Sequence, residues 1–570
     1  SRRMISNTSS ICRRLWRAGV AFWLVFASAG AHMAAAAEKA VAEVKFSIDH
    51  GFYEAPFALD ITTKIAGAKI YFTMNGIEPA ESNAELYRGP IQITTTTIIR
   101  AMAWKDGAAS QTATRTYIFP REVLKQTGAG FPRSWGTNNG KAVPAYYKLA
   151  AEVLHDAQYE QELAPALKSI PTISLILESR DLFDSGTGLY SNPKESGPDW
   201  ERPASLEVIF PDGRKGFQVN CGLRIQGGWN RRPEESPKHA FRVVFKKKYG
   251  PGKLKLPLFP EPGAREFDTL ILRAGCNNTW LHWSAEERRR GDYIRDQWMR
   301  DTLREMDHVS ARGYFVHLYL NGLYWGLYNL CERPSGAFVA ANFGGKPGDY
   351  DVRNGDHILE GDGEAWKKLM QLVNSGVKGE REFAALRAQA DVSELIDYLI
   401  ANFYGANADW DHASNWYAAR RRDDSGKWQF FVWDGERTLE NIEANSMAFD
   451  DDQSPPRLFH KLRENSEFRR MFAERARHHL TDDGPLTPSR AAARYEKWSK
   501  TIQSAIIAEA ARWGNYRCDI HQYKTGPYEL YTPREHWKPE IERLLKDYFP
   551  KRTQVVIKQF EEAGLMEKEK

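Results

Sequence analysis

The residues best suited to chemistry lie around two strand-like runs in the second half of the chain. Asp411 and Asn415 lead into the first run, and Asp434 and Glu436 follow the second. If residues 423–426 form the loop between the runs, the two runs pair as a hairpin with Asn415 directly opposite Asp434. Carboxylate and amide oxygens are hard ligands that suit Mg²⁺, Mn²⁺ or Ca²⁺ rather than zinc. The sequence therefore predicts a metal site where the hairpin opens.

Two other interpretations of these residues stay open on spacing alone. Carboxylates at hairpin ends also cap turns and neighbouring helices, which would make the cluster structural. Paired carboxylates can cleave glycosides when suitably separated, and Asp409, Asp411, Asp434 and Glu436 offer such pairs. The glycosidase interpretation predicts sugar release without a nucleotide.

A second group of residues upstream could hold phosphates. Gly227 and Gly228 lie in a loop between two expected strands, Arg224 precedes the loop, and Lys238 opens the second strand. A glycine loop can lie over phosphates while a lysine bridges their oxygens, and an acid such as Glu332 would orient that lysine. The alternative is an ordinary Gly-Gly turn with a surface lysine.

These residues need a scaffold of strands followed by helices. Alternating apolar runs predict a strand-rich lobe from about residue 170 to 356, interrupted by a helix at 292–306, and longer amphipathic stretches predict a helix-rich lobe from 364 onward. The expected strands are 172–178, 204–210, 218–226, 239–246, 269–273 and 313–320, and the expected later helices are 364–375, 392–407, 456–480, 487–513 and 533–563.

Residues 44–120 read as a separate all-β unit with a strong turn at Asn75-Gly76. The segment Tyr71 to Pro79, with Tyr87-Arg-Gly-Pro90 and Thr95 to Ala101, resembles the C-terminal module of chitobiases and β-hexosaminidases. The resemblance implies an immunoglobulin-like sandwich with a spacer or carbohydrate-proximal role. Residues 121–169 read as a linker that carries a helix, expected at 146–159.

The remaining motifs resemble the CotH kinase-like family, the relatives of spore-coat protein H. The matching stretches are Arg224-Ile-Gln-Gly-Gly228, Pro237-Lys238, Ile294-Arg-Asp296, Leu320 to Tyr328 with Glu332-Arg333, Asp411 to Asn415, and Trp433-Asp434. The resemblance implies an α+β atypical protein-kinase-like domain over 170–515, followed by a C-terminal helical extension over 516–570.

The same resemblance implies an activity and roles for residues. Characterised members use ATP and a divalent metal, Mg²⁺ or Mn²⁺, to phosphorylate Ser or Thr of secreted or coat proteins. Asp411 would be the catalytic or metal-proximal carboxylate, Asn415 and Asp434 metal ligands, and Lys238 the phosphate-binding lysine. The chain departs from the family pattern at Trp229-Asn230, where serines are frequent, and at Glu436, where Asp is frequent.

The first 37 residues are typical of a secretory signal peptide, with five arginines followed by the apolar run 18–31 and small residues to Ala37. We therefore expect export to the periplasm, the cell surface or the medium, with membrane contact only through this transient segment. The net charge of +5 comes from those five arginines, so the remainder is neutral and offers no basic surplus for nucleic acid. Without CxxC spacing among the cysteines a zinc site is not expected.

The sequence thus predicts an exported atypical kinase that phosphorylates Ser or Thr of an envelope or secreted protein. The alternative is a non-catalytic surface scaffold, kinase-like in fold, that contacts cell-wall or extracellular polysaccharide. Metal-dependent ATP binding separates the two, because only the kinase requires it.

Overall fold

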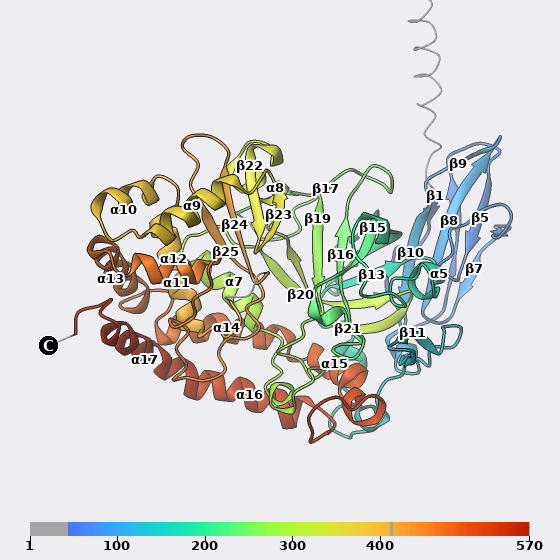
Figure 1. Cartoon of the computed structure of the whole chain (residues 1–570). Helices are drawn as coiled ribbons and strands as arrows, with labels where there is room; N and C mark the ends of the chain where they lie inside the picture. Colours follow the sequence, from blue (N-terminus) through green and yellow to red (C-terminus); the bar gives the residue numbers. More distant parts are fainter. Residues whose placement is uncertain (1–43, 261, 411–413, 569–570) are drawn as a thin grey trace, which may run out of the picture.

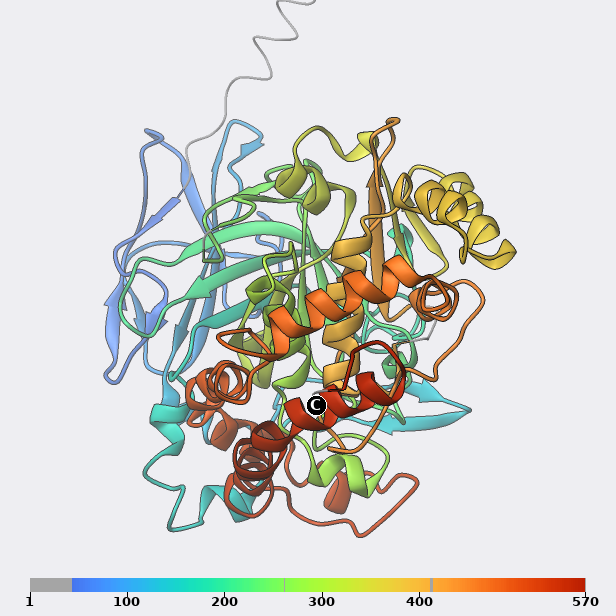
Figure 2. The ribbon, with the colours of Figure 1, turned by 90° about the vertical axis from the view of Figure 1, so that its left-hand side faces the viewer.

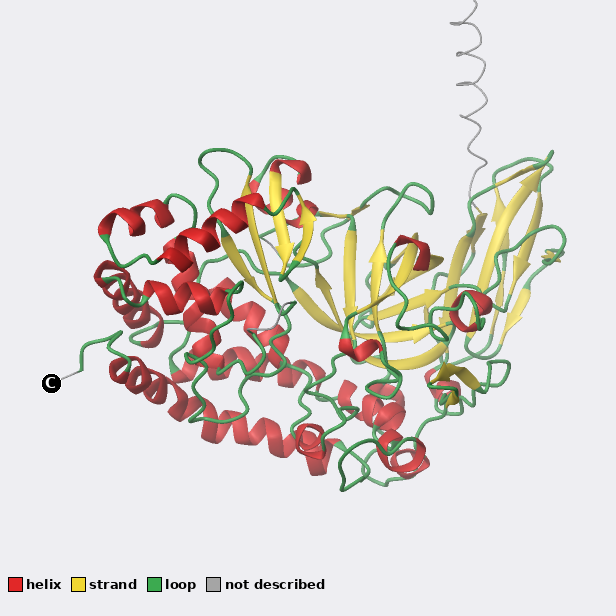
Figure 3. Ribbon diagram, viewed as in Figure 1, coloured by secondary structure: helices red, strands yellow, loops and turns green. Residues whose placement is uncertain are grey.

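The computed structural model describes residues 44–260, 262–410 and 414–568 (Figure 1). A β-rich N-terminal domain lies at one side, a barrel of strands occupies the middle, and helices fill the other side and the base (Figure 3). Within the described ranges, no helix is long and apolar enough to cross a membrane. The predicted signal peptide, residues 1–37, and the predicted catalytic Asp411 lie outside the described residues.

The N-terminal domain is built on a six-stranded sheet with the order β2-β10-β8-β5-β6, and β9 beside β8. Its apolar core includes Leu59, Ile93, Ile99 and Tyr117. Two short antiparallel pairs, β1 with β4 and β3 with β7, complete the domain. The strands are β1 (Val44–Phe46), β2 (Gly51–Phe52), β3 (Phe57–Leu59), β4 (Ile61–Thr63), β5 (Lys69–Thr73), β6 (Glu85–Leu86), β7 (Ile91–Ile93), β8 (Thr97–Lys105), β9 (Ala108–Ala109) and β10 (Ala113–Ile118).

Buried polar contacts hold this domain against the barrel. Glu207 of the barrel is fully buried, and its carboxylate lies 2.7 Å from His50 Nδ1 and accepts the Thr116 N–H at 3.1 Å. Thr116 Oγ1 also lies 2.9 Å from Ser174 Oγ. Buried groups of this kind are costly to leave unpaired, so the N-terminal domain is a fixed part of the molecule.

Residues 121–169 pack against the barrel. The segment contains the short helices α2 (Pro120–Val123), α3 (Ala151–Leu154) and α4 (Leu163–Ala166) and the hairpin β11 (Ser134–Asn138)–β12 (Lys141–Pro144). The expected helix at 146–159 is wrong in extent, since only the four residues of α3 are helical there. Trp135 and Tyr147 instead join the aromatic core of the barrel, and that packing overrides the helical pattern.

Seven strands close into a barrel with the order β13-β14-β15-β16-β19-β21-β20, and the parallel pairing of β13 with β20 completes the ring. Successive side chains alternate between the two faces: Leu223, Ile225, Phe241 and Val243 belong to the barrel core, whereas Arg224 lies between them in sequence and faces outward. The strands are β13 (Thr172–Ile176), β14 (Arg202–Ile209), β15 (Phe217–Gln226), β16 (Ala240–Val244), β19 (Thr269–Arg273), β20 (Gly313–Leu320) and β21 (Leu323–Glu332).

A second sheet, with the order β23-β22-β24-β25, covers part of the outer barrel wall. Ile271 and Cys331 from the barrel and Tyr417 and Trp433 from this sheet share one apolar cluster. The hairpin with the candidate chemistry is thereby fixed against the barrel. The strands are β22 (Tyr350–Asn354), β23 (His357–Glu360), β24 (Trp416–Arg421) and β25 (Gln429–Val432).

Most of the helices share one apolar core, whereas α5 (Ser179–Phe183) packs in the barrel core and α8 (Gly336–Phe343) beneath the second sheet, and α11 (Val392–Gly405) is buried along nearly its whole length. Its Asp391 N-cap accepts the Glu394 N–H, and the buried Glu394 carboxylate accepts the Phe430 N–H of β25 at 3.0 Å. This helix therefore positions the hairpin. Figure 2 shows the C-terminal helices in front of the strands. The others are α6 (Ala285–Arg289), α7 (Arg295–Glu305), α9 (Glu364–Ser375), α10 (Glu380–Arg387), α12 (Pro455–Leu462), α13 (Ser466–Leu480), α14 (Pro488–Ile502), α15 (Ala505–Trp513), α16 (Lys538–Arg543) and α17 (Phe549–Glu562).

Candidate functional site

Arg273 lies at the centre of an acidic cluster, which consists of Asp434 and Glu436 after the hairpin and Asp296 on α7. It ends β19 on the outer barrel face, where its Nη2 lies 2.6 Å from Asp434 Oδ1 and 2.8 Å from Glu436 Oε1. Its Nε lies 3.2 Å from Oδ2 of Asp296 on α7. One guanidinium thus joins three carboxylates from two segments of the chain, α7 and the turn after β25, and charge-assisted hydrogen bonds of this kind are strong.

Glu436 is fully occupied by protein partners. Its Oε1 accepts from Arg273, and its Oε2 accepts the backbone N–H groups of Cys276 at 3.0 Å and Asn277 at 2.8 Å. Burial and the nearby negative charge of Asp434 raise the pKa of Glu436 to about 7, against the opposing effect of Arg273. This carboxylate is held within the protein and offers no free oxygen in this arrangement.

Asp434 differs from Glu436 because its side chain is 35% exposed. It adopts a left-handed backbone conformation with φ 61°, which costs a residue other than glycine about 1 kcal/mol or more. The next residue, Gly435, donates its N–H to Asp296 Oδ1 at 3.0 Å, and a Cβ there would lie 2.9 Å from Met299. The strained turn after β25 places the Asp434 carboxylate beside Arg273 with one oxygen bound.

The predicted pairing of Asn415 with Asp434 is wrong by one position. Trp416 pairs with Val432 and Tyr417 with Phe431, a register that puts Asn415 opposite Trp433. A shift of one residue moves side chains to opposite faces of a strand. The cause is the loop: β24 ends at Arg421 and β25 begins at Gln429, so the connection is not the symmetric four-residue turn that the sequence suggested.

Asn415 therefore does not meet Asp434 as predicted. Its Nδ2 donates to the backbone oxygen of Asp409 at 2.7 Å and so stabilises the chain before β24. Asp411, the predicted catalytic carboxylate, lies outside the described residues.

Lys238 is buried, and its carboxylate partner is not the predicted Glu332. Its Nζ lies 2.6 Å from Glu509 Oε1 on α15 and 2.6 Å from the backbone oxygen of Leu327. Glu332 instead binds Arg312, with Oε1 2.6 Å from Nη2 and Oε2 2.9 Å from Nε. A lysine that is 1% exposed and paired in this way holds α15 against β21.

The glycine loop is a tight, ordered turn. Gly227 has φ 120°, and a Cβ there would lie 2.1 Å from Asn230 Oδ1, so only glycine fits. Gly228 has open space around its Cα and leads into the 3-10 helix Trp229–Arg231. Trp229 is 53% exposed, and Arg224 Nε, on β15 before the loop, lies 2.8 Å from Glu201 Oε2.

A cavity of about 20 Å³ lies among these residues, lined by Arg273, Asp296 and Glu436 and by the rings of Tyr293 and Tyr328. Lys238 Nζ lies 4.9 Å from the centre of the Tyr328 ring and 5.7 Å from that of Tyr293. The acidic cluster borders this space, and the lysine is in contact with two of the rings that line it. It has room for about one water molecule and none for a nucleotide.

Comparison with models of known protein families now identifies the larger unit. The model described as CotH kinase protein matches residues 223–556, more than half of the 570-residue chain. The chain belongs to the CotH kinase family. The model of the chitobiase/beta-hexosaminidase C-terminal domain matches residues 48–116, inside the β-rich N-terminal domain. Both resemblances are confirmed. A search of curated proteins finds no match.

The divalent metal that the family implies can be tested against the donor atoms. Over the part of the chain that the structure describes, no three His, Cys, Asp or Glu side chains are grouped to hold an ion. Glu436 is occupied, and Asn415 faces elsewhere in the register. Among the described residues, Asp434 alone of the predicted ligands keeps both partial exposure and a carboxylate oxygen without a described partner, so it fits a hard cation.

Sequence reasoning missed the residues that balance these charges. Arg273 appeared only as the last residue of a predicted strand, and Glu509 only within a predicted helix. Asp296 belonged to a family motif but received no role. Its position two residues into a helix, beside a second Asp at 292, was the one available signal of a buried ionic site.

Proposed function

We propose that this protein is a CotH-family protein kinase that transfers the γ-phosphoryl group of ATP to Ser or Thr of an exported protein. The observation that carries the proposal is Asp434, a partly exposed carboxylate on a strained turn after the hairpin that the family match covers. Strained backbone is typical of functional sites, because the surrounding structure must hold it in place.

In this proposal the protein supplies position and charge. Asp434 would hold Mg²⁺ or Mn²⁺ through its free oxygen, and the metal, when bound, neutralises charge that develops on the transferred group. Asp296 and Glu436 hold Arg273, which fixes Asp434 from the other side. By its resemblance, Asp411 would accept or orient the proton of the acceptor hydroxyl.

Transfer of label from ATP tests the proposal. The purified chain would be incubated with labelled ATP, Mg²⁺ or Mn²⁺, and a mixture of envelope proteins, beside Asp434→Ala and Asp411→Ala. We expect each substitution to reduce transfer by roughly a hundredfold or more, the loss typical of removing a group that stabilises transition-state charge. Asp424→Ala, an exposed carboxylate at the far end of the same hairpin, is the matched control and should leave transfer unchanged. Transfer that survives both test substitutions would exclude this site.

A non-catalytic surface scaffold is the second candidate. It is favoured by the internal pairing of Lys238 with Glu509 and of Glu436 with Arg273, which leaves both side chains occupied. The fixed docking of the N-terminal domain is also suited to a rigid module at an envelope or polysaccharide surface. A scaffold predicts that the parent chain shows no metal-dependent ATP binding.

A further inference from the structure

The outer face of the barrel carries arginines that oppose one another. Arg224 on β15 lies directly opposite Arg242 on β16 in the antiparallel register, and both side chains point away from the barrel core. Arg333 follows the end of β21 and acts electrostatically on Arg242. Like charges directly opposite on one sheet face are unfavourable, so this arrangement calls for a compensating anion.

The protein itself supplies little negative charge here. Glu201 is shared by Arg224, Lys246 and Lys248, at 2.8, 2.9 and 3.3 Å respectively. Arg242 binds only the neutral Gln226, whose Oε1 accepts from Nε at 2.8 Å and from Nη2 at 2.6 Å. Among the described residues Arg242 has no carboxylate partner.

Arg333, like Arg242, lacks a carboxylate partner among the described residues. Across the described ranges it makes no ion pair, and its buried Nε has no hydrogen-bond partner. Asp268 is the acid that Arg333 affects: burial raises the pKa of Asp268 and Arg333 opposes the rise, but the two do not form an ion pair. Burial, and then Arg333, lower the pKa of Arg242 to about 9. The guanidinium of Arg333, like that of Arg242, therefore has no anion beside it to balance its charge.

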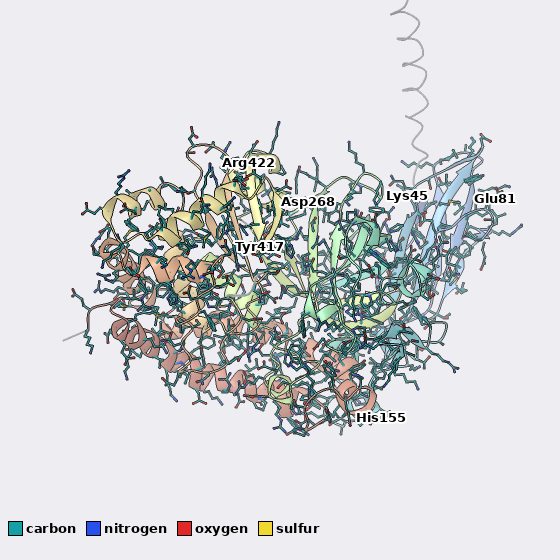
Figure 4. All side chains as sticks on the ribbon, viewed as in Figure 1. Lys45, Glu81, His155, Asp268, Tyr417 and Arg422 are labelled. Atoms are coloured by element: carbon teal, nitrogen blue, oxygen red, sulfur yellow. The ribbon has the colours of Figure 1, made fainter. Side chains whose placement is uncertain are left out.

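The arginine face adjoins the candidate active site. Arg242 pairs with Ile271 across β16 and β19, and Arg273 lies two residues further along the same face of β19. Arg273 in turn lies 5.0 Å from the centre of the Trp433 ring, beside Tyr417 of the hairpin. Asp268, just before β19, and Tyr417, on β24, are labelled in Figure 4.

We propose that Arg242 and Arg333, beside Arg224, form an anion subsite that takes the phosphate chain of a nucleoside triphosphate. The planar guanidinium matches phosphate oxygens with paired hydrogen bonds. The subsite rests on the proposed kinase function, and it transfers the phosphate-binding role from Lys238, whose charge Glu509 already neutralises, to residues whose charge is free. Inorganic polyphosphate shares this chemistry, so the test includes it.

Binding of tripolyphosphate without metal tests the subsite directly. Titration calorimetry and the thermal midpoint would be measured for the parent, Arg242→Gln, Arg333→Gln and Arg242→Lys. We expect either Gln variant to bind at least about tenfold more weakly, the loss of one charged hydrogen-bonded contact, and the Lys variant to retain part of the affinity. Arg214→Gln is the matched control, an exposed arginine in the turn between β14 and β15 that pairs with Asp212, and it should bind as the parent does.

The outcomes separate the subsite from the kinase proposal. A parent that does not bind tripolyphosphate, or Gln variants that bind it with parental affinity, would overturn the subsite. If the parent transfers label from ATP while Arg242→Gln keeps the parental KM for ATP, the kinase stands and the subsite is wrong. If tripolyphosphate and ATP both depend on Arg242 but no label is transferred, the subsite stands and the kinase proposal fails. Asp434→Asn should retain tripolyphosphate binding, because Asp434 would hold the metal, which this assay leaves out.

Discussion

Lys238 and Arg242 lie four positions apart in sequence but have different surroundings and partners. Lys238 is buried, with Glu509 Oε1 and the Leu327 carbonyl each at 2.6 Å. Arg242 lies on the outer barrel face against other arginines and, among the described residues, has a hydrogen-bond partner only in Gln226. The contrast teaches that the balance of charge around a cation, rather than its type or its place in a motif, separates a structural role from a binding role.

The acids of the site show the same contrast. Both oxygens of Glu436 are occupied by Arg273 and by two backbone N–H groups, whereas Asp434 keeps one oxygen without a partner among the described residues. In each pair the fully satisfied residue is held by contacts within the fold, and the incompletely satisfied residue is the one that we propose binds a ligand. Three measurements on stability can break or sharpen this distinction.

Lys238→Met should give the largest change in the free energy of unfolding. Removing one partner of a buried ion pair leaves Glu509 charged and unpaired, and such changes cost about 3 to 5 kcal/mol. The free energy of unfolding would be measured by guanidinium denaturation. Lys247→Met, an exposed lysine that follows β16, is the control and should stay within about 0.5 kcal/mol of the parent. A loss for Lys238→Met as small as that of the control would contradict the structural role.

The double variant Lys238→Met/Glu509→Gln sharpens the result. Gln keeps an oxygen for the Leu327 N–H while removing the unpaired charge. We therefore expect the double variant to be more stable than Lys238→Met alone, which is a coupling that independent residues do not show.

Much of the scaffold could be predicted from periodicity. The strands Thr269–Arg273 and Gly313–Leu320 and the helix Glu364–Ser375 occur with the predicted bounds, since each is set by a local apolar pattern between clear breaks. The expected helices 456–480 and 487–513 are each divided in two, by residues 463–465 and 503–504. The local pattern of apolar residues predicts which segments form helices or strands, but it predicts less well where those helices and strands end.

The site was less predictable because its contacts span long sequence distances. Glu509 reaches Lys238 only because α15 packs on β21, and Arg273 meets Asp434 only because the hairpin covers the barrel. The wrong hairpin register shows a second limit. Asp423 to Gly426 is a good turn sequence, but the residues that start β25 are fixed by Glu394 and by the apolar contact with the barrel.

Glu436→Gln should change how stability depends on pH. The folded pKa of Glu436 is about 7, above its ordinary value, so the folded state binds the proton more tightly and loses stability as pH rises from about 4.5 to 7. Gln does not titrate, so the variant should gain about 2 to 3 kcal/mol relative to the parent between about pH 5 and pH 8.

A control on the same loop tests this assignment. The pKa of Glu440 is lowered, through its hydrogen bond with Arg437 and against the effect of burial. Its contribution to stability is complete above its ordinary pKa and is lost only at lower pH, so Glu440→Gln should differ from the parent by a constant amount over the same range. Parallel pH profiles for the parent and Glu436→Gln would show that Arg273 fully neutralises Glu436.

Arg242→Gln should give the smallest change in the free energy of unfolding, and the sign of that change tests whether Arg242 is repelled by its neighbours. Without an anion, removing a charge that faces Arg224 across the strands relieves a repulsion and should raise the free energy of unfolding by about 0.2 to 1 kcal/mol. Arg242→Lys keeps the charge and should show no such gain. The gain should shrink at high salt, because salt screens partly exposed charges. If both variants lose stability equally, Arg242 serves to hold Gln226 and the barrel wall. It would then have a structural role, as Lys238 does, despite its unbalanced charge.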